Sequence, residues 1–328
     1  MMKTKNTVRF LYNHSVVSLE NTDPNLTVLQ YLRETLDKPG TKEGCASGDC
    51  GACTVVVAEL EKSSKSENKM QLQYYSINAC ITFIGHLHGK QLITVEDLKE
   101  EDKLHYAQQT LVDNHGTQCG FCTPGFVMSS FALHKHNKTP TRAQVLEALA
   151  GNLCRCTGYR SIIEAVISSS VGVDEDSFAK NYQATVATLQ ALQEFPAPIL
   201  TGNTHHYVAP KNIDELAYEL KNEPNSILVA GGTDLALSVT QHLEAIDNLV
   251  YLGAVKELTQ IDESEEAIII GSALPYSKFI DTLHQYYQDL GSMIERIGSK
   301  QIRNSGTLGG NIGNASPIGD MPPALIAL

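Results

Sequence analysis

The fold is decided by the stretch Gly44-Cys45-Ala46-Ser47-Gly48-Asp49-Cys50-Gly51-Ala52-Cys53-Thr54. It contains three cysteines at x4 and x2 spacing, and Cys80 follows after 26 further residues. The residues between the thiols are small, so the chain can form an irregular loop whose backbone N–H groups point at the sulfurs. Such a loop brings three thiolates together on one compact, anionic group.

This spacing matches the plant-type [2Fe–2S] ligand pattern, in which the fourth cysteine is distant. Four thiolates also make a tetrahedral zinc site, but structural zinc usually takes two close cysteine pairs. The pattern therefore predicts an iron–sulfur cluster, with zinc as the competing interpretation. The predicted ligands are Cys45, Cys50, Cys53 and Cys80.

A second set follows as Cys119-x2-Cys122 and, 31 residues later, Cys154-x-Cys156. This spacing alone is compatible with iron or with zinc. Helices are expected to begin just after Cys122 and Cys156, and their positive N-terminal ends favour an anionic cluster. The two sets use all eight cysteines of the chain. A disulfide framework is not expected in a chain of this size without an export signal.

Length and charge narrow the function classes. The chain has 328 residues, which predicts two or three domains. Its 25 basic and 37 acidic residues give a formal net charge of −12, which disfavours nucleic acid or an anionic membrane surface as the main partner. No apolar run approaches the roughly 18 residues of a membrane span, and no signal peptide is visible. We expect a soluble, cytoplasmic protein.

The predicted secondary structure changes along the chain. The first part reads as a small sheet packed on one helix, and the middle part reads as four helices. Residues 61–70 are expected to form an exposed turn, and His134 and His136 to face solvent. The expected early elements are a hairpin over 7–19, a helix over 27–36 and strands over 54–58, 72–81 and 92–95.

The later elements begin with four helices, one of which carries the capping box Thr141-x-x-Gln144. These helices are expected over 104–112, 124–136, 141–150 and 161–169. A partly helical linker follows, and then an αβ pattern with a helix over 213–221. Residues 227–230 and 267–271 are expected to be buried strands.

Three long motifs carry a family resemblance. They are the stretch quoted above, Gln118-Cys119-Gly120-Phe121-Cys122-Thr123-Pro124-Gly125, and Gly151-Asn152-Leu153-Cys154-Arg155-Cys156-Thr157-Gly158-Tyr159-Arg160. Together they resemble the xanthine dehydrogenase family of molybdenum hydroxylases. The resemblance continues through residues 227–234 and 305–320, which in that family contact flavin. The order, iron–sulfur and then flavin, resembles the small subunit of two-subunit members.

The resemblance implies an α+β multidomain fold. It would consist of a β-grasp ferredoxin-like domain over 1–92, a four-helix [2Fe–2S] domain over 93–170, a linker over 171–198 and an α/β FAD-binding domain over 199–328. Family members continue beyond the counterpart of Asp320, so the FAD-binding domain is expected to be incomplete at its C-terminus.

The resemblance also implies the flavin contacts. A strand ending in glycines frees N–H groups for a pyrophosphate, while hydroxyl, amide and carboxylate groups suit ribityl and phosphate oxygens. Gly231 and Gly310 are expected to matter through close backbone approach. The predicted FAD-binding residues are Leu228, Val229, Ala230, Gly231, Gly232, Thr233, Asp234, Thr307, Gly310, Asn311, Ser316 and Asp320.

The implied function is electron transfer. A molybdopterin-binding large subunit would hydroxylate hypoxanthine or xanthine, with Gln118 facing the pterin. The electrons would pass through two [2Fe–2S] clusters to FAD and on to NAD. No catalytic residue for hydroxylation is expected on this chain. The alternatives are a relative acting on aldehydes, carbon monoxide or an aromatic thioester, and a non-enzymatic electron carrier or zinc module.

Overall fold

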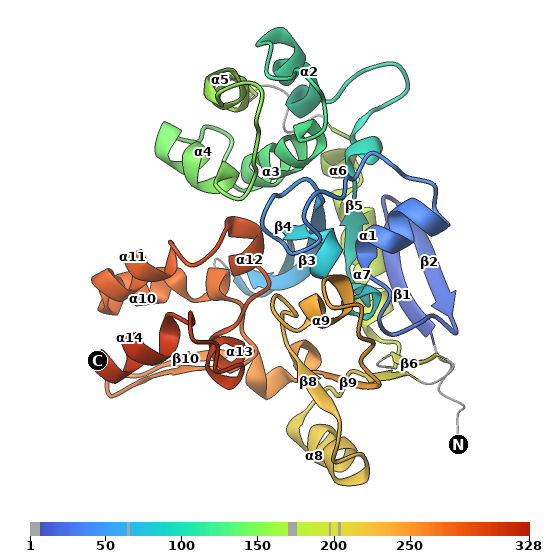
Figure 1. Cartoon of the computed structure of the whole chain (residues 1–328), viewed down its shortest axis with the longest axis vertical. Helices are drawn as coiled ribbons and strands as arrows, with labels where there is room; N and C mark the ends of the chain where they lie inside the picture. The colour runs from blue at the N-terminus through green and yellow to red at the C-terminus, as the bar shows by residue number, and fades with distance from the viewer. Residues whose placement is uncertain (1–6, 64–65, 170–175, 197, 203–204) are drawn as a thin grey trace.

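The computed structural model describes residues 7–63, 66–169, 176–196, 198–202 and 205–328. Its first part is a five-stranded sheet in the order β2-β1-β5-β3-β4 (Figure 1). The predicted hairpin is confirmed, with Asn13 in the left-handed region (φ 52°) at its turn. β1 pairs parallel with β5, and the other pairs are antiparallel. The strands are β1 (Thr7–Tyr12), β2 (Ser15–Glu20), β3 (Thr54–Ser63), β4 (Ser66–Asn78) and β5 (Gln91–Ile93).

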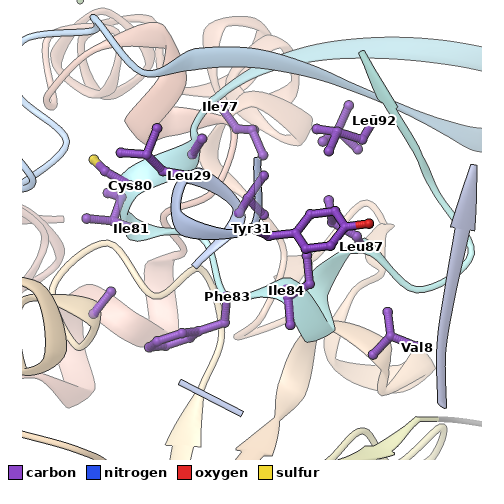
Figure 2. Packing of buried hydrophobic residues seen from close by; sticks show 14 of the residues in the cluster. Val8, Leu29, Tyr31, Ile77, Cys80, Ile81, Phe83, Ile84, Leu87 and Leu92 are labelled. Carbon is purple, nitrogen blue, oxygen red and sulfur yellow. The ribbon is translucent and has the colours of Figure 1, made fainter. Parts of the chain in front are cut away.

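One helical segment packs on this sheet, as predicted. It begins as α1 (Val28–Gln30), which Thr27 caps through a capping box, and continues as a π-helical turn over Tyr31–Thr35. Figure 2 shows Leu29 and Tyr31 among the buried side chains of this core. Cys80 belongs to the same core and lies in a short 3-10 helix, Ala79–Ile81, rather than in the predicted strand.

The exposed turn predicted over residues 61–70 is wrong for most of its length. β3 continues to Ser63 and β4 starts at Ser66, with residues 64–65 outside the described part of the chain. Polar residues predict solvent exposure, but a long hairpin accommodates them because its ladder of backbone hydrogen bonds does not depend on the side chains.

The four predicted helices of the middle part are confirmed. Thr141 accepts from the Gln144 N–H at 3.3 Å, as the capping box requires. α3 packs across β3 and β4. The helices are α2 (Tyr106–Asp113), α3 (Thr123–His136), α4 (Arg142–Leu149) and α5 (Arg160–Ser168).

The expected exposure of His134 is wrong, because the end of α5 covers it. Its side chain is fully buried, and Nε2 lies 2.9 Å from the Val166 carbonyl and 2.6 Å from Ser169 Oγ. His136 is exposed, as expected, and its Nε2 lies 2.6 Å from the Tyr74 carbonyl. The His134 ring thus packs inside the helical part, whereas the His136 ring joins the end of α3 to β4 at the surface.

The expected linker contains two helices, α6 (Ser177–Lys180) and α7 (Tyr182–Gln193). α7 packs along β1, β3 and β4 and buries Leu189 and Leu192. Residues 170–175 and 197 of the predicted linker lie outside the described residues.

The last part of the chain has a four-stranded sheet in the order β6-β7-β9-β8 and a two-stranded hairpin, β10–β11. The strands are β6 (Ile199–Thr201), β7 (His206–Val208), β8 (Ile227–Val229), β9 (Asn248–Tyr251), β10 (Ile261–Glu263) and β11 (Ile268–Ile270). The helices are α8 (Ile213–Asn222), α9 (Ala236–Thr240), α10 (Ile280–Tyr286), α11 (Gln288–Ile294), α12 (Lys300–Arg303), α13 (Leu308–Gly313) and α14 (Met321–Ala327). None of the helices in the described ranges has the length and apolar character that a bilayer crossing requires.

The two strands predicted to be buried are only partly so. β8 is an edge strand, and Leu228 is 47% exposed; in the two-stranded ribbon, Ile269 of β11 is 64% exposed. An apolar run predicts burial on both faces, whereas strands at an edge or in a two-stranded ribbon have fewer neighbouring elements to cover them.

A buried ionic triad joins α6 to the helical part. Asp176 accepts from Lys135 Nζ at 2.6 Å and lies 3.2 Å from His105 Nε2. Burial raises the pKa of Asp176, but His105 and Lys135 outweigh it and lower the pKa below its ordinary value. The triad therefore stabilises the fold at pH values above the ordinary carboxylate pKa, and this contribution is lost as the pH falls through the lowered value.

We expect Asp176→Asn to lower the free energy of unfolding by about 3 kcal/mol at neutral pH, because one partner of a buried charge pair is removed. The deficit should shrink in acid, where the wild-type carboxylate is protonated. Urea unfolding at both pH values measures it. Glu164→Gln is the control: its pair with Arg142 is exposed and should change stability by less than about 0.5 kcal/mol. Equal effects of the two variants would contradict the stabilising role of the buried Asp176 ion pair.

Candidate functional site

The first cysteine set comes together as predicted. Cys53 and Cys80 are buried, and Cys53 donates to the Cys80 sulfur at 3.3 Å. The Cys80 thiol lowers the pKa of Cys45, and burial and the Cys45 thiol raise the pKa of Cys50, so these thiols lie close to one another as well. The four thiols thus form one connected group from the loop and the end of β4, and all are free cysteines.

The loop directs backbone donors at one sulfur. Cys45 Sγ accepts from the N–H groups of Ser47 (3.4 Å), Asp49 (3.3 Å) and Cys50 (3.3 Å). The Cys80 thiol, with help from Ser47 and the Cys50 N–H, lowers the pKa of Cys45 to about 3. The loop is therefore built to stabilise a thiolate, which is the ligand form that metals bind. Gly48 takes the positive φ (80°) that this turn requires.

The second set is nearer the surface. Cys119 and Cys156 are exposed and hydrogen-bonded to each other, and Cys122 is hydrogen-bonded to Cys154. Burial opposes ionisation of Cys154, but donors from Thr157 and Cys156 lower its pKa. Cys122 is the N-cap residue of α3, so one of the expected helix starts is confirmed at the thiols.

Each cysteine set brings four thiols near one another. Within the described ranges, no three His, Cys, Asp or Glu side chains converge closely enough to hold a single metal ion. A [2Fe–2S] cluster takes two cysteines on each of its two irons, so four thiols that do not converge on one point fit it better than one tetrahedral ion. The donor chemistry of both sets therefore fits this cluster type.

The two cysteine loops touch each other, which the sequence did not predict. The Leu153 N–H donates to the Cys50 carbonyl at 3.0 Å. A Cβ on Gly51 would lie 2.2 Å from the Gly151 carbonyl oxygen, and one on Gly125 would lie 2.2 Å from the Gly51 carbonyl oxygen. The three glycines were visible in the cysteine motifs of the sequence. No sequence pattern, however, indicates that they contact one another.

A cavity of about 240 Å³ lies between the first sheet and the last part of the chain. It brings together three of the predicted FAD-binding residues, Ala230, Gly231 and Thr307. The other nine predicted residues are not among its lining residues: Leu228, Val229, Gly232, Thr233, Asp234, Gly310, Asn311, Ser316 and Asp320. The predicted loops therefore meet at one site, although most of the predicted side chains lie around it rather than in it.

The close approach expected at Gly231 is to protein backbone. A Cβ there would lie 1.9 Å from the Ser305 carbonyl oxygen, and the positive φ (70°) belongs to Gly232. Thr307 caps α13 by accepting from the Gly310 N–H at 2.9 Å. These contacts hold the 231 and 305 loops together and shape the cavity wall.

The opposite wall carries paired charges that the sequence analysis missed. Lys278 lies 2.5 Å from Glu59 and 2.7 Å from Glu61, and Lys90 lies 2.9 Å from Glu59. Burial raises the pKa of Glu59, but the two lysines outweigh it and lower the pKa below its ordinary value. No sequence signal links these residues, because Lys278 is 219 residues from Glu59.

Two buried polar atoms of the cavity lining have no hydrogen-bond partner within the described part of the chain, His86 Nε2 and Asn304 Oδ1. Burial lowers the pKa of His86 to about 3, so its ring is neutral, and it stacks on Tyr251 with ring centroids 4.2 Å apart. Unpaired buried polar atoms in a cavity are typical of a site that binds a polar heterocycle. The flavin ring of FAD fits this chemistry.

Family models match three successive stretches. Residues 12–85 match the 2Fe-2S iron-sulfur cluster binding domain, residues 94–167 the [2Fe-2S] binding domain, and residues 200–328 the FAD binding domain in molybdopterin dehydrogenase. The chain belongs to the iron–sulfur and FAD-binding part of the molybdenum hydroxylase family. The expected fold class, with ferredoxin-like, helical [2Fe–2S] and FAD-binding domains, is thereby confirmed.

Curated relatives in this family have different substrates in their names. The chain is 33% identical over 369 residues to the xanthine dehydrogenase of Drosophila pseudoobscura pseudoobscura, covering 97% of this chain and 27% of that protein. It is 31% identical to aldehyde oxidase 3 of Rattus norvegicus, covering 96% of this chain and 27% of that protein. The chain thus spans about a quarter of the length of these relatives.

Solved structures in the family match over about half of the chain. Quinoline 2-oxidoreductase from Pseudomonas putida 86 is 29% identical with a TM-score of 0.42, covering 56% of this chain and 98% of the matched one. Aldehyde oxidoreductase from Desulfovibrio gigas is 30% identical with a TM-score of 0.44, covering 51% of this chain and 17% of the matched one.

The contact between the cysteine loops can be tested with one glycine. Gly51→Ala should lower the unfolding midpoint in urea strongly, because its Cβ would overlap the Gly151 carbonyl at a positive φ of 68°. Gly120→Ala is the matched control, since it also has a positive φ (85°) but its Cβ meets nothing within 4 Å. The control should cost only the strain of a left-handed residue, about 1 kcal/mol. A Gly51 variant no less stable than the control would disprove the contact.

Proposed function

We propose that this chain is the electron-transfer part of a xanthine dehydrogenase. The eight thiols hold two [2Fe–2S] clusters, and FAD binds at the cavity with NAD as the final electron acceptor. A molybdopterin-binding large subunit hydroxylates hypoxanthine or xanthine. The observation that carries the proposal is that three sites neighbour one another. The loop of the second thiol set, which has exposed thiols, contacts the loop of the first set, and the cavity lies against the sheet next to the first set.

The order of the sites supports a direction for the electrons. Cys119 and Cys156 are exposed, so the second set suits contact with a partner subunit. Cys53 directly precedes β3 and Cys80 lies just after β4; both are buried, and these two strands line the cavity, so the first set suits transfer to flavin. When bound, the clusters carry single electrons and the flavin accepts two for hydride transfer.

The residues of this chain bind and tune these groups. The N–H groups on Cys45 stabilise negative charge at its sulfur, and hydrogen bonds to cluster sulfurs are one determinant of cluster potential. At the cavity, Ala230, Gly231 and Thr307 would hold FAD together with Asn304 and His86. The proposal also includes the other nine predicted residues, as neighbours in sequence of the residues that line the cavity. They are Leu228, Val229, Gly232, Thr233, Asp234, Gly310, Asn311, Ser316 and Asp320.

We propose the domain bounds from the sequence with this function: 1–92, 93–170, a linker over 171–198, and 199–328. A cytoplasmic location and the hetero-oligomer with the large subunit are also part of this proposal.

A related activity on aldehydes is the second candidate function, because aldehyde oxidase 3 is nearly as similar to this chain as xanthine dehydrogenase is. The deciding test is whether xanthine, but not an aldehyde, bleaches the flavin of the native complex, and whether added NAD then restores the flavin absorption.

The proposed function predicts how much iron the chain binds. The full chain should bind four irons with the visible absorption of [2Fe–2S] centres, and Cys50→Ser should alter one of its two paramagnetic resonance signals. The reason is that the second set lies in separate loops, between the helices, with its own four thiols. Zinc in place of iron, or loss of both signals in a folded Cys50 variant, would exclude two independent clusters.

The cavity gives the second prediction. Gly231→Ala should lower the FAD content several-fold at unchanged iron content, because its Cβ would displace the Ser305 backbone that shapes the cavity wall. Gly313→Ala is the control, since its Cβ meets nothing within 4 Å. FAD and iron are measured per chain after purification. An FAD content equal to that of the control would remove the cavity from the proposal.

A further inference from the structure

One buried side chain bridges the two cysteine loops. Gln301, in α12 of the last part of the chain, is 1% exposed. Its Nε2 donates to Thr54 Oγ1 (3.1 Å), Asn152 Oδ1 (3.1 Å) and Ser129 Oγ (3.3 Å). Thr54 directly follows Cys53 of the first set, and Asn152 lies two residues before Cys154 of the second set.

The Gln301 amide joins a connected group of side-chain hydrogen bonds. Thr54 Oγ1 already donates to the Gly51 carbonyl at 2.7 Å, and Ser129 Oγ donates to Asn152 Oδ1 at 2.7 Å. Asn152 Nδ2 donates to the Gly51 carbonyl at 3.1 Å. Asn152 Nδ2 also donates to Thr54 Oγ1 at 3.3 Å. Thr54 and Asn152 therefore have a second donor within the group, whereas Ser129 Oγ accepts from Gln301 alone among the described residues.

The helix that carries Gln301 is fixed on both sides. Asn304 Nδ2 donates to the Ser76 carbonyl of β4 at 2.8 Å, and the Arg303 guanidinium pairs with Glu147 of α4. Because α12 is attached to the sheet and to the helical part, it holds the amide of Gln301 at the contact of the loops. A Cβ on Gly151 would lie 2.2 Å from Gln301 Oε1, so the site also fits the amide closely.

We propose that Gln301 is a positioning residue for electron transfer: it fixes the Cys53 end of one loop against the Cys154 end of the other and so sets the separation of the two clusters. This inference rests on the proposed function, because it requires both clusters. It assigns to the flavin-binding part of the chain a role in the geometry of the cluster pair.

The test is Gln301→Met in the full, cluster-loaded chain, because Met keeps the length of the side chain and removes the amide. In the doubly reduced protein, the magnetic interaction between the clusters splits their paramagnetic resonance signals. We expect the variant to shift or lose this splitting, while iron content and the individual g values stay as in the wild type. Gln288→Met, at an exposed position in α11, is the matched control and should keep the splitting.

Ser129→Ala is the second variant, in case Gln301→Met does not fold, and it should shift the splitting in the same way. A lower melting temperature with unchanged splitting in both variants would show a merely structural role and overturn the proposal. A wild-type spectrum with two cluster signals and no splitting would also overturn it. A wild-type chain without iron–sulfur clusters would instead disprove the proposed function.

Discussion

The contact of the two cysteine loops is the constraint on which the rest of the structure depends. At this contact Gly51, Gly125 and Gly151 leave no room for a Cβ, and the Leu153 N–H reaches the Cys50 carbonyl. The loops come from the sheet and from the helices, so the two parts can have only one relative orientation. α3 accordingly packs across β3 and β4, with buried residues on most of its surface.

The last part of the chain is attached to this core by polar groups. Gln301 enters the loop contact, and Lys278 forms ion pairs with Glu59 and Glu61 on β3. These interactions hold the 231 and 305 loops over the same sheet, so the cavity has one wall from each part. A buried charge pair requires well-fixed partners, because a misplaced charge keeps its desolvation cost without the compensating attraction.

This arrangement gives the proposed electron route a structural basis. Two thiols of the second set are exposed, its loop contacts the loop of the first set, and Thr82, two residues after Cys80, lines the cavity. The predicted hairpin, four helices and capping box could be read from the sequence because periodicity and caps act within a few residues. The cysteine sets could be read for the same reason, since a short loop must supply most of each ligand set.

The sequence by itself determined the family, the two thiol sets and the elements that carry them. The tertiary structure decided which surfaces are covered. His134 is buried because α5 ends over it, and Leu228 is exposed because β8 is an edge strand. The tertiary structure also decided that Ala230, Gly231 and Thr307 line the cavity with Lys278, and that Gln301 joins both cysteine loops. The Gln301 contacts join residues 149 and 247 positions apart, and all of these features depend on how whole elements pack rather than on any local pattern.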